Sequence, residues 1–186
     1  MIEVQLIRSI DGKSIPAWLV PLTAKHSADF NTFWRERLIG STDEDQYWDW
    51  ERKKQIYLAS GMGIFEGYAI ECEQMTQGMM IIQTGGYRSR VESDRRLVYI
   101  HSIATAPWNR VNSDPPGFRA VGRVLLQFAR FRSEELGYGG LVGLHSLPSA
   151  EEFYRKMSMI DGGADPEKED LRYFEWYRRR SDDREE

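Results

Sequence analysis

The sequence has few of the features that mark secreted, membrane-spanning or disulfide-bonded proteins. Its 186 residues include one cysteine, Cys72, which excludes an internal disulfide and a cysteine-rich metal site. The longest apolar runs are far shorter than the ~20 residues that a membrane helix requires. Residues 1–5 lack the basic start and apolar core of a secretion signal. We therefore expect a cytoplasmic protein with no membrane partner.

Positive charge is also in short supply. The chain has 25 Lys and Arg residues against 29 Asp and Glu residues, a formal net charge of −4. Electrostatic capture of nucleic acid depends on a basic surface, so a nucleic acid partner is not expected. Hydrophobic residues make up 41% of the chain, enough for the core of one domain, which we place at residues 1–177. Residues 178–186 are charged, have nothing apolar to bury and are expected to form a disordered tail.

Alternation of apolar and polar residues, or enrichment in Val, Ile and Tyr, predicts strands in both halves of the chain. A turn at Asp11-Gly12 separates the first two. The predicted strands are residues 2–7, 15–20, two within 64–84 that join near 74–77, then 97–105, 141–144 and 171–177.

Helical periodicity appears between these strands. It predicts a helix over residues 27–38 and a long one over 119–136. Capping boxes at Ser41 with Glu44, and at Ser149 with Glu152, predict the starts of two more helices. Strands that alternate with helices favour a mixed α/β sheet, with a right-handed crossover through the long helix.

The start of the 119–136 helix has the features of a phosphate-binding turn. The first backbone N–H groups of a helix lack intrahelical partners and lie at the positive end of its dipole, where phosphate binds. Gly122 leaves room for a pyrophosphate to approach, and Arg119 and Arg123 add positive charge. The alternative is an ordinary turn with two solvated arginines, because a short turn of this kind is a weak signal.

Three segments, residues 99–107 (YIHSIATAP), 119–126 (RAVGRVLL) and 149–157 (SAEEFYRKM), occur in an order that is more specific than any one of them. Together they resemble the GNAT family of acetyl-CoA-dependent N-acetyltransferases, over about residues 97–159. The resemblance implies the acyl-CoA N-acyltransferase fold, a mixed, mostly antiparallel twisted sheet flanked by helices. It also implies acetyl-CoA as co-substrate and no metal.

In this family the strand that residues 97–105 resemble offers backbone groups to the pantetheine arm, and the next turn, R/Q-x-x-G-x-G/A, binds the pyrophosphate. The resemblance thus assigns cofactor binding to Ile103, Ala104, Thr105, Gly117, Arg119, Ala120, Val121, Gly122 and Arg123. Two motif positions differ, since Ala120 replaces the first glycine and Gly117 the leading Arg or Gln. The loop of residues 108–118 is also longer than usual. Later in the chain, Leu147 occupies a position where the family often has an asparagine, and Ser158 one where it usually has a glycine.

The resemblance assigns the proton donor to Tyr154. A phenol with a pKa of ~10 is protonated at neutral pH and can donate to the thiolate of a thiol with a pKa of ~8.5. The alternative is core packing, because Ala150, Phe153, Tyr154 and Met157 form a helical stripe. His101, on the strand that approaches the thioester, is the predicted base, since an imidazole with a pKa of ~6.5 can accept a proton near neutrality. A purely structural histidine is equally consistent with the sequence.

Aromatic and acidic residues alternate around the first two helices, where the acceptor would bind. Such a rim would attract a cationic amine. The acids are Asp43, Glu44, Asp45, Asp49 and Glu51. The alternative is that the aromatic residues pack the helices and the acids favour helix starts. The residues that we assign to the substrate are Trp34, Trp48, Glu71 and His145; the last two, with Glu73, are also weaker candidates for the base.

The predicted function is the transfer of an acetyl group from acetyl-CoA to a primary amine, of a small molecule, peptide or protein, by direct attack. This reaction needs a neutral amine, a stabilised oxyanion and a proton for the thiolate. One alternative is a non-catalytic acyl-CoA-binding module. Another is an acetyltransferase toxin that acts on charged tRNA and uses a basic patch at Arg88, Arg90, Arg95 and Arg96. A homodimer is compatible with the sequence.

Overall fold

The computed structural model describes residues 1–110 and 113–177, which form two compact units. The first unit consists of the described residues of Met1–Gln83 and His101–Phe128, and the second of the described residues of Thr84–Ile100 and Ala129–Glu186. Strand β5 (Val98–Thr105) and helix α4 (Val121–Glu135) each contribute residues to both units. The expectation of a single domain over residues 1–177 stays a prediction, and the expected tail lies outside the described residues.

The first unit is built on an antiparallel sheet. Its own strands are β1 (Ile2–Arg8), β2 (Ser14–Pro21), β3 (Phe65–Cys72), β4 (Met75–Gln83) and the short β6 (Phe118–Arg119). Their order is β6-β1-β2-β3-β4, and residues 101–105 of β5 lie beside β4. Glu73 and Gln74, both with positive φ, form the turn between β3 and β4, as a two-residue hairpin requires. This turn begins one residue before residues 74–77, where the sequence predicted the connection between the two strands.

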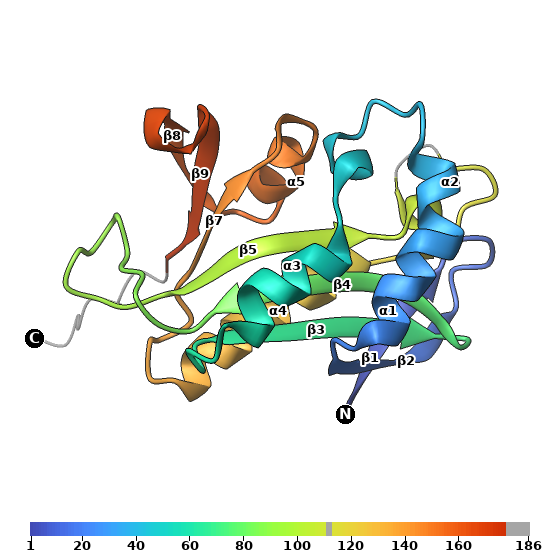
Figure 1. Ribbon diagram of the computed structural model, residues 1–186, viewed down its shortest axis with the longest axis horizontal. Coiled ribbons are helices and arrows are strands. Elements are labelled where there is room, and N and C mark those ends of the chain that lie inside the picture. The colour runs from blue at the N-terminus through green and yellow to red at the C-terminus, as the bar shows by residue number, and fades with distance from the viewer. Residues whose placement is uncertain (111–112, 178–186) are drawn as a thin grey trace, which may run out of the picture. The chain divides into compact units, whose positions relative to one another are not determined.

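Three helices of the first unit lie on one face of its sheet. α1 (Ala24–Asp29), a π-helical turn (Phe30–Trp34) and α2 (Arg35–Leu38) follow one another directly, and α3 (Trp50–Tyr57) lies beside them (Figure 1). Their buried aromatic side chains form one apolar cluster with β4. The cluster anchors the helices that surround the predicted acceptor site.

The predicted capping box at Ser41 is wrong. Glu44–Tyr47 form one 3₁₀ turn, and α3 begins later, where the carboxylate of Asp49 accepts the backbone N–H of Arg52 at 2.9 Å. Asp49 is therefore the residue that caps this helix. The first helix also begins earlier than predicted, because Nδ1 of His26 accepts the backbone N–H of Thr23 at 2.8 Å.

α4 begins two residues later than predicted. Phe118 and Arg119 pair with β1, so the chain stays extended up to Arg119 and turns into the helix at Ala120. The N-terminal half of α4 packs on the face of β4 opposite α1, α2 and α3. There a Cβ on Gly78 would lie 2.7 Å from Cγ1 of Val121.

The second unit combines parallel and antiparallel strand pairs. Residues 98–100 of β5 run parallel to β7 (Val142–Ser146), β9 (Leu171–Trp176) is antiparallel to β7, and β8 (Ile160–Asp165) forms the edge. The sequence does not predict β8, which contains two glycines and little apolar side chain. α5 (Glu151–Lys156) follows a 3₁₀ turn that contains Ser149, so the helix has Ala150 at its N-cap and begins later than predicted.

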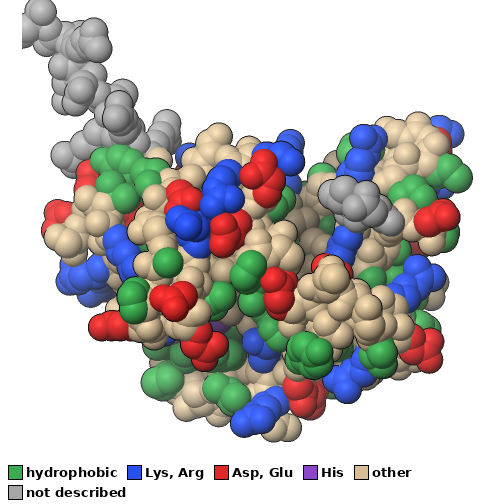
Figure 2. All heavy atoms as spheres, turned by 90° about the horizontal axis from the view of Figure 1, so that it is seen from above, with side chains coloured by type: hydrophobic (Ala, Val, Ile, Leu, Met, Phe, Trp, Pro, Cys, Tyr) green, Lys and Arg blue, Asp and Glu red, His purple; other side chains and the backbone are tan. Residues whose placement is uncertain are grey.

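The parallel pair of β5 and β7, joined through α4, confirms the predicted crossover, and the two strand sets confirm a mixed, mostly antiparallel sheet flanked by helices. In the part of the chain that the structure describes, no helix is long and apolar enough to cross a bilayer. Basic and acidic side chains are interspersed on the face seen in Figure 2. That face therefore carries no large patch of one sign.

Candidate active site

The start of α4 leaves backbone donors free. Val124 donates its N–H to the carbonyl of Ala120 at 2.9 Å, which makes Ala120 the cap of the helix. The N–H groups of Val121, Gly122 and Arg123 therefore lie before the first helical hydrogen bond, at the positive end of the helix dipole. Ala120 has a φ of 75°, a left-handed conformation that glycine adopts without strain. Although the residue differs from the family motif, the backbone has the shape that a glycine would allow.

Two cations flank these donors. The side chains of Arg119 and Arg123 are exposed. Among the described residues, no carboxylate lies within ion-pair distance of either guanidinium. Free N–H groups, a helix dipole and two unpaired arginines fit a pyrophosphate at this position.

Gly117, by contrast, has no amide to offer a ligand. Its N–H donates to the carbonyl of Trp108 at 2.7 Å, and its own carbonyl accepts from Ser9 at 2.8 Å. A Cβ at Gly117 would lie 2.5 Å from Oδ1 of Asn109. The same Asn109 oxygen accepts the N–H of Phe118 at 2.6 Å. The contacts of Gly117 thus hold the loop before α4 in place. Within the predicted cofactor turn, the candidates for binding phosphate through backbone N–H groups are the residues that follow Ala120.

Internal contacts occupy part of the β5 segment that was predicted to bind the pantetheine arm. Ala104 is 6% exposed and belongs to the apolar cluster of the first unit. The carbonyl of Thr105 accepts from the guanidinium of Arg110 at 3.0 and 3.3 Å. Ile103 is half-buried. Of these three residues, Ile103 is the remaining candidate for a backbone contact with the pantetheine arm.

His101 is held in a defined orientation. Its Nε2 lies 2.7 Å from Oε1 of Gln83, and its ring packs 4.7 Å from the ring centroid of Tyr57 and 5.5 Å from that of Phe65. An amide oxygen can only accept, so Nε2 carries the proton of the neutral ring. Nδ1 is then the nitrogen that can take up a proton.

The next residue of β5 also faces α3. Oγ of Ser102 accepts a hydrogen bond from Nζ of Lys53, one turn before Tyr57, at 3.0 Å. His101 and Ser102 of β5 therefore both contact side chains of α3.

The acidic residues near α3 are occupied by internal partners. Asp43 and Asp45 pair with Arg110 at 2.8 and 2.6 Å, Asp49 caps α3, and Glu51 pairs with Lys54 at 3.1 Å. The structure therefore supports the structural explanation of these acids over a rim that attracts a cation.

Two of the predicted substrate residues are structural. Trp34 is fully buried and donates its indole N–H to the carbonyl of Thr76 at 3.2 Å, so it does not lie on a rim. Glu71 accepts from Lys25 at 3.0 Å and contacts Nε2 of His26 at 3.1 Å. Both side chains are committed to anchoring α1 and its π-helical turn on the sheet. Trp48, half-buried beside α3, stays a candidate for acceptor contact.

Tyr154, in the second unit, has a buried ring and an uncommitted hydroxyl. The residue is 4% exposed, and its ring lies 5.5 Å from that of Phe174. Within the described ranges, no residue forms a hydrogen bond with its hydroxyl. Burial raises the pKa of this phenol, so the proton is retained at neutral pH. Tyr154 is thus a protonated phenol whose hydroxyl has no hydrogen-bond partner in the described part of the chain.

His145 has no ring nitrogen free for a substrate. Nδ1 lies 2.6 Å from the hydroxyl of Tyr99, and Nε2 lies 2.8 Å from the carboxylate of Asp165. Burial lowers the pKa of His145, although Asp165 acts in the opposite direction. The side chain joins β5, β7 and β8 of the second unit, which is a structural role.

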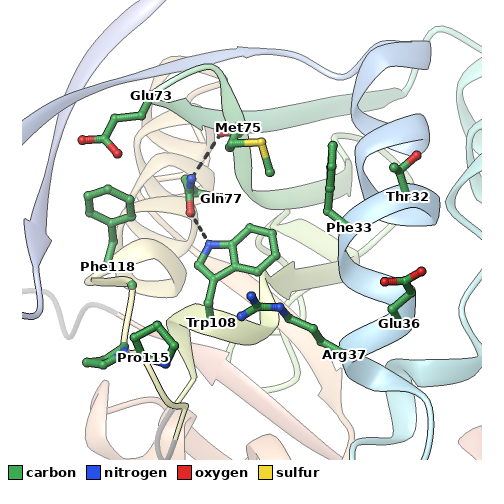
Figure 3. Close-up of a pocket in the computed structure, with 12 residues that line it drawn as sticks. Thr32, Phe33, Glu36, Arg37, Glu73, Met75, Gln77, Trp108, Pro115 and Phe118 are labelled. Carbon is green, nitrogen blue, oxygen red and sulfur yellow. Dashed lines mark hydrogen bonds between the residues drawn. The ribbon is translucent and has the colours of Figure 1, made fainter.

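A cavity of about 500 Å³ lies beside the loop that leads into α4 (Figure 3). Its walls include Phe33 and Arg37 of the helical layer, Trp108 and Phe118. Figure 3 shows Arg37 pointing toward Trp108, with its guanidinium carbon 5.4 Å from the ring centroid. Among the described lining residues, the sequence assigned Gly117 to the cofactor and offered Glu73 as a weaker candidate for the base. A ligand here would contact the cofactor loop but not His101.

Sequence reasoning missed Lys53. The residue lies between Trp50 and Tyr57 at helical spacing, so it interrupts an apolar stripe. A lysine in such a stripe is the signal that could have drawn attention to it. Cys72, in contrast, is 2% exposed and burial raises the pKa of its thiol, which fits a packed cysteine rather than a reactive one.

Comparisons with solved structures identify the architecture. The Bacillus subtilis N-acetyltransferase YlbP in complex with coenzyme A is 14% identical, with 87% of this chain and 95% of that chain covered and a TM-score of 0.53. The GNAT domain of S. lividans PAT is 12% identical over 94% and 96% of the two chains, with a TM-score of 0.59. The PaiA N-acetyltransferase of Thermoplasma acidophilum in complex with coenzyme A is 12% identical over 87% and 99%, with the same TM-score of 0.59. No protein-family model and no curated protein sequence matches the chain. The chain has the fold of the GNAT N-acetyltransferases.

Proposed function

We propose that the protein transfers an acetyl group from acetyl-CoA to a primary amine. The observation that carries this proposal is the start of α4, where three N–H groups precede the first helical hydrogen bond and two exposed arginines have no carboxylate partner among the described residues. Such a site suits a diphosphate. The fold supports the same assignment, because similar solved structures are N-acetyltransferases and two are in complex with coenzyme A.

In the proposed reaction the amine attacks the thioester carbonyl, the C–N bond forms and the C–S bond breaks. Tyr154 donates its phenolic proton to the departing thiolate, because its hydroxyl is not bound by any described residue. His101 accepts the proton of the attacking amine at Nδ1, with its ring held by Gln83. The amides after Ala120 and the two arginines bind the pyrophosphate.

The proposal is tested by thiol release from acetyl-CoA in the presence of a panel of primary amines. We expect turnover with a subset of the panel and product heavier than the amine by one acetyl group. Tight binding of coenzyme A by calorimetry, without thiol release for any amine, would instead show a non-catalytic acyl-CoA-binding module. The changed motif position at Ala120 and the closed amide of Gly117 are the observations that favour that second candidate.

The toxin alternative is not supported by the side chains that it requires. Arg88 donates to the carbonyl of Asp94 at 2.7 Å, Arg90 pairs with Asp165, and Arg95 pairs with Glu92 at 3.1 Å. These arginines serve internal contacts of the second unit rather than an open basic patch.

A further inference from the structure

Lys53 is a half-buried cation without a counter-ion. Its Nζ donates to Oγ of Ser102 at 3.0 Å and lies 4.2 Å from the ring centroid of Trp48. No carboxylate of the described chain comes within ion-pair distance of this ammonium. Burial alone lowers the pKa of Lys53, so no nearby acid compensates for the lost hydration.

The acids around Lys53 are already neutralised. The neighbouring Glu51 pairs with Lys54, and Asp49 is used by the helix start. Asp43 and Asp45 share Arg110. A buried, unmatched charge is unfavourable, and an anionic ligand would offset that cost.

The position of Lys53 indicates which anion it would meet. Ser102 directly follows His101, and the ring of Tyr57, one turn after Lys53 on α3, packs on the His101 ring. The proposed phosphate site lies at the start of α4, which packs at Gly78 of β4 on the face of the sheet opposite α3 (Figure 1). Lys53 therefore lies beside the proposed base and not beside the cofactor phosphates.

We infer that Lys53 binds a carboxylate of the acceptor, so that the protein acetylates amines which also carry a carboxylate, such as amino acids and short peptides. This inference rests on the proposed function. The acidic sequence around Trp48 predicted an acceptor with extra positive charge. The structure favours a negative group instead, because those acids pair with other residues, whereas Lys53 has no carboxylate partner in the described chain. Ser102 would hold the ammonium in place through its hydroxyl.

Matched acceptors test the inference. Amino acids and dipeptides are compared with their C-terminal amides, in which an uncharged carboxamide replaces the carboxylate. We expect wild-type kcat/KM to favour the carboxylate by ~10-fold or more, as a charge-assisted hydrogen bond would give. Lys53→Met should reduce this preference to about one, mainly through a higher KM for the carboxylate, and Lys53→Arg should keep part of it. Lys54→Met, a change in the neighbouring paired lysine, should keep the wild-type preference.

A second measurement does not depend on turnover. Lys53 and Lys54 are labelled with acetic anhydride in the protein without coenzyme A, and the two sites are compared by mass spectrometry. We expect the carboxylate compounds to slow labelling of Lys53 relative to Lys54, and the amides to have no such effect. Absence of turnover with every acceptor would contradict the proposed function, while protection of Lys53 would still support the anion site. Equal use of acids and amides by the wild type, or equal labelling with both, overturns the inference.

Discussion

Ala120 holds a backbone conformation that its side chain disfavours. A φ of 75° places its Cβ close to the following carbonyl oxygen, at a cost of about 1 kcal/mol for a non-glycine residue. The conformation persists because β6 fixes the chain on one side and α4 on the other. The residue thus aims the free amides of α4 at the proposed pyrophosphate site.

Replacing Ala120 by glycine should therefore stabilise the protein. We expect Ala120→Gly to raise the free energy of unfolding by up to about 1 kcal/mol in urea titrations. Ala150→Gly is the matched control, because Ala150 has a φ of −100° and gains nothing from glycine. A loss of stability in Ala120→Gly equal to that of the control would contradict the strain argument.

The catalytic role proposed for Tyr154 depends on its hydroxyl oxygen, whereas its packing role depends on its ring. Tyr154→Phe keeps the ring beside Phe174 and removes a hydroxyl that no described residue binds. We expect kcat for acetyl transfer to fall by about 100-fold, with little change in melting temperature or in the affinity for coenzyme A. Tyr47→Phe, at a position 83% exposed, is the control that should keep the wild-type rate. A Tyr154→Phe rate equal to that of the control would remove Tyr154 from the mechanism.

At the scale of elements, the close approach of α4 to β4 depends on Gly78. A Cβ there would lie 2.7 Å from Cγ1 of Val121, 3.0 Å from Cδ1 of Leu125 and 3.3 Å from the carbonyl oxygen of Ala104. The first two contacts would push the helix away from the sheet, and the third is with backbone that cannot yield easily. The start of α4 would move with the helix.

Gly78→Ala should cost about 1 to 3 kcal/mol of unfolding free energy, the usual range for overpacking. It should also weaken coenzyme A binding measured by calorimetry. In a Val121→Ala background the same substitution should cost less, because the nearest atom has been removed. Additive effects of the two substitutions would show that the contact does not exist.

Asp165 links β8 to its neighbours through charge. Arg90 and His145 both bind its carboxylate and hold its pKa at about 2, below the ordinary 3.8. A depressed pKa means that the folded state favours the ionised form. The stability that Asp165 contributes is therefore present above its ordinary pKa and is lost as the pH falls through about 2.

Urea unfolding across an acid pH series measures this contribution. Asp165→Asn should be less stable than the wild type at neutral pH, and the difference should shrink as the pH falls from about 5 toward about 2. Parallel stability curves for the two proteins would contradict the assignment of this ion pair to the folded state.

At the scale of the whole molecule, local sequence patterns predicted most elements but not their exact ends. The strands and the β5–α4–β7 crossover followed from periodicity, because alternation and helical spacing are local properties. The helix at α3 began elsewhere because the Asp49 cap competed with the Ser41 box. β8 was missed because its side chains are small and its pairing with β9 is a tertiary property.

The candidate site was less predictable than the fold, because it too depends on tertiary contacts. The resemblance selected Tyr154, His101 and the turn at Ala120, whose roles stay predictions. It also selected His145 and Glu71, whose partners lie 20 and 45 residues away in the chain. No local pattern shows that such a side chain is already occupied. Lys53 was missed because its lack of a counter-ion emerges only when the other acids are seen paired.

The central claim is that the first amides of α4 bind the diphosphate of coenzyme A. Amide chemical shifts, measured by NMR during titration with coenzyme A and separately with pantetheine, test it directly. We predict large shifts at Val121, Gly122 and Arg123 with coenzyme A and small ones with pantetheine, which lacks the diphosphate. Saturable binding of coenzyme A that leaves these three amides unshifted would contradict the account.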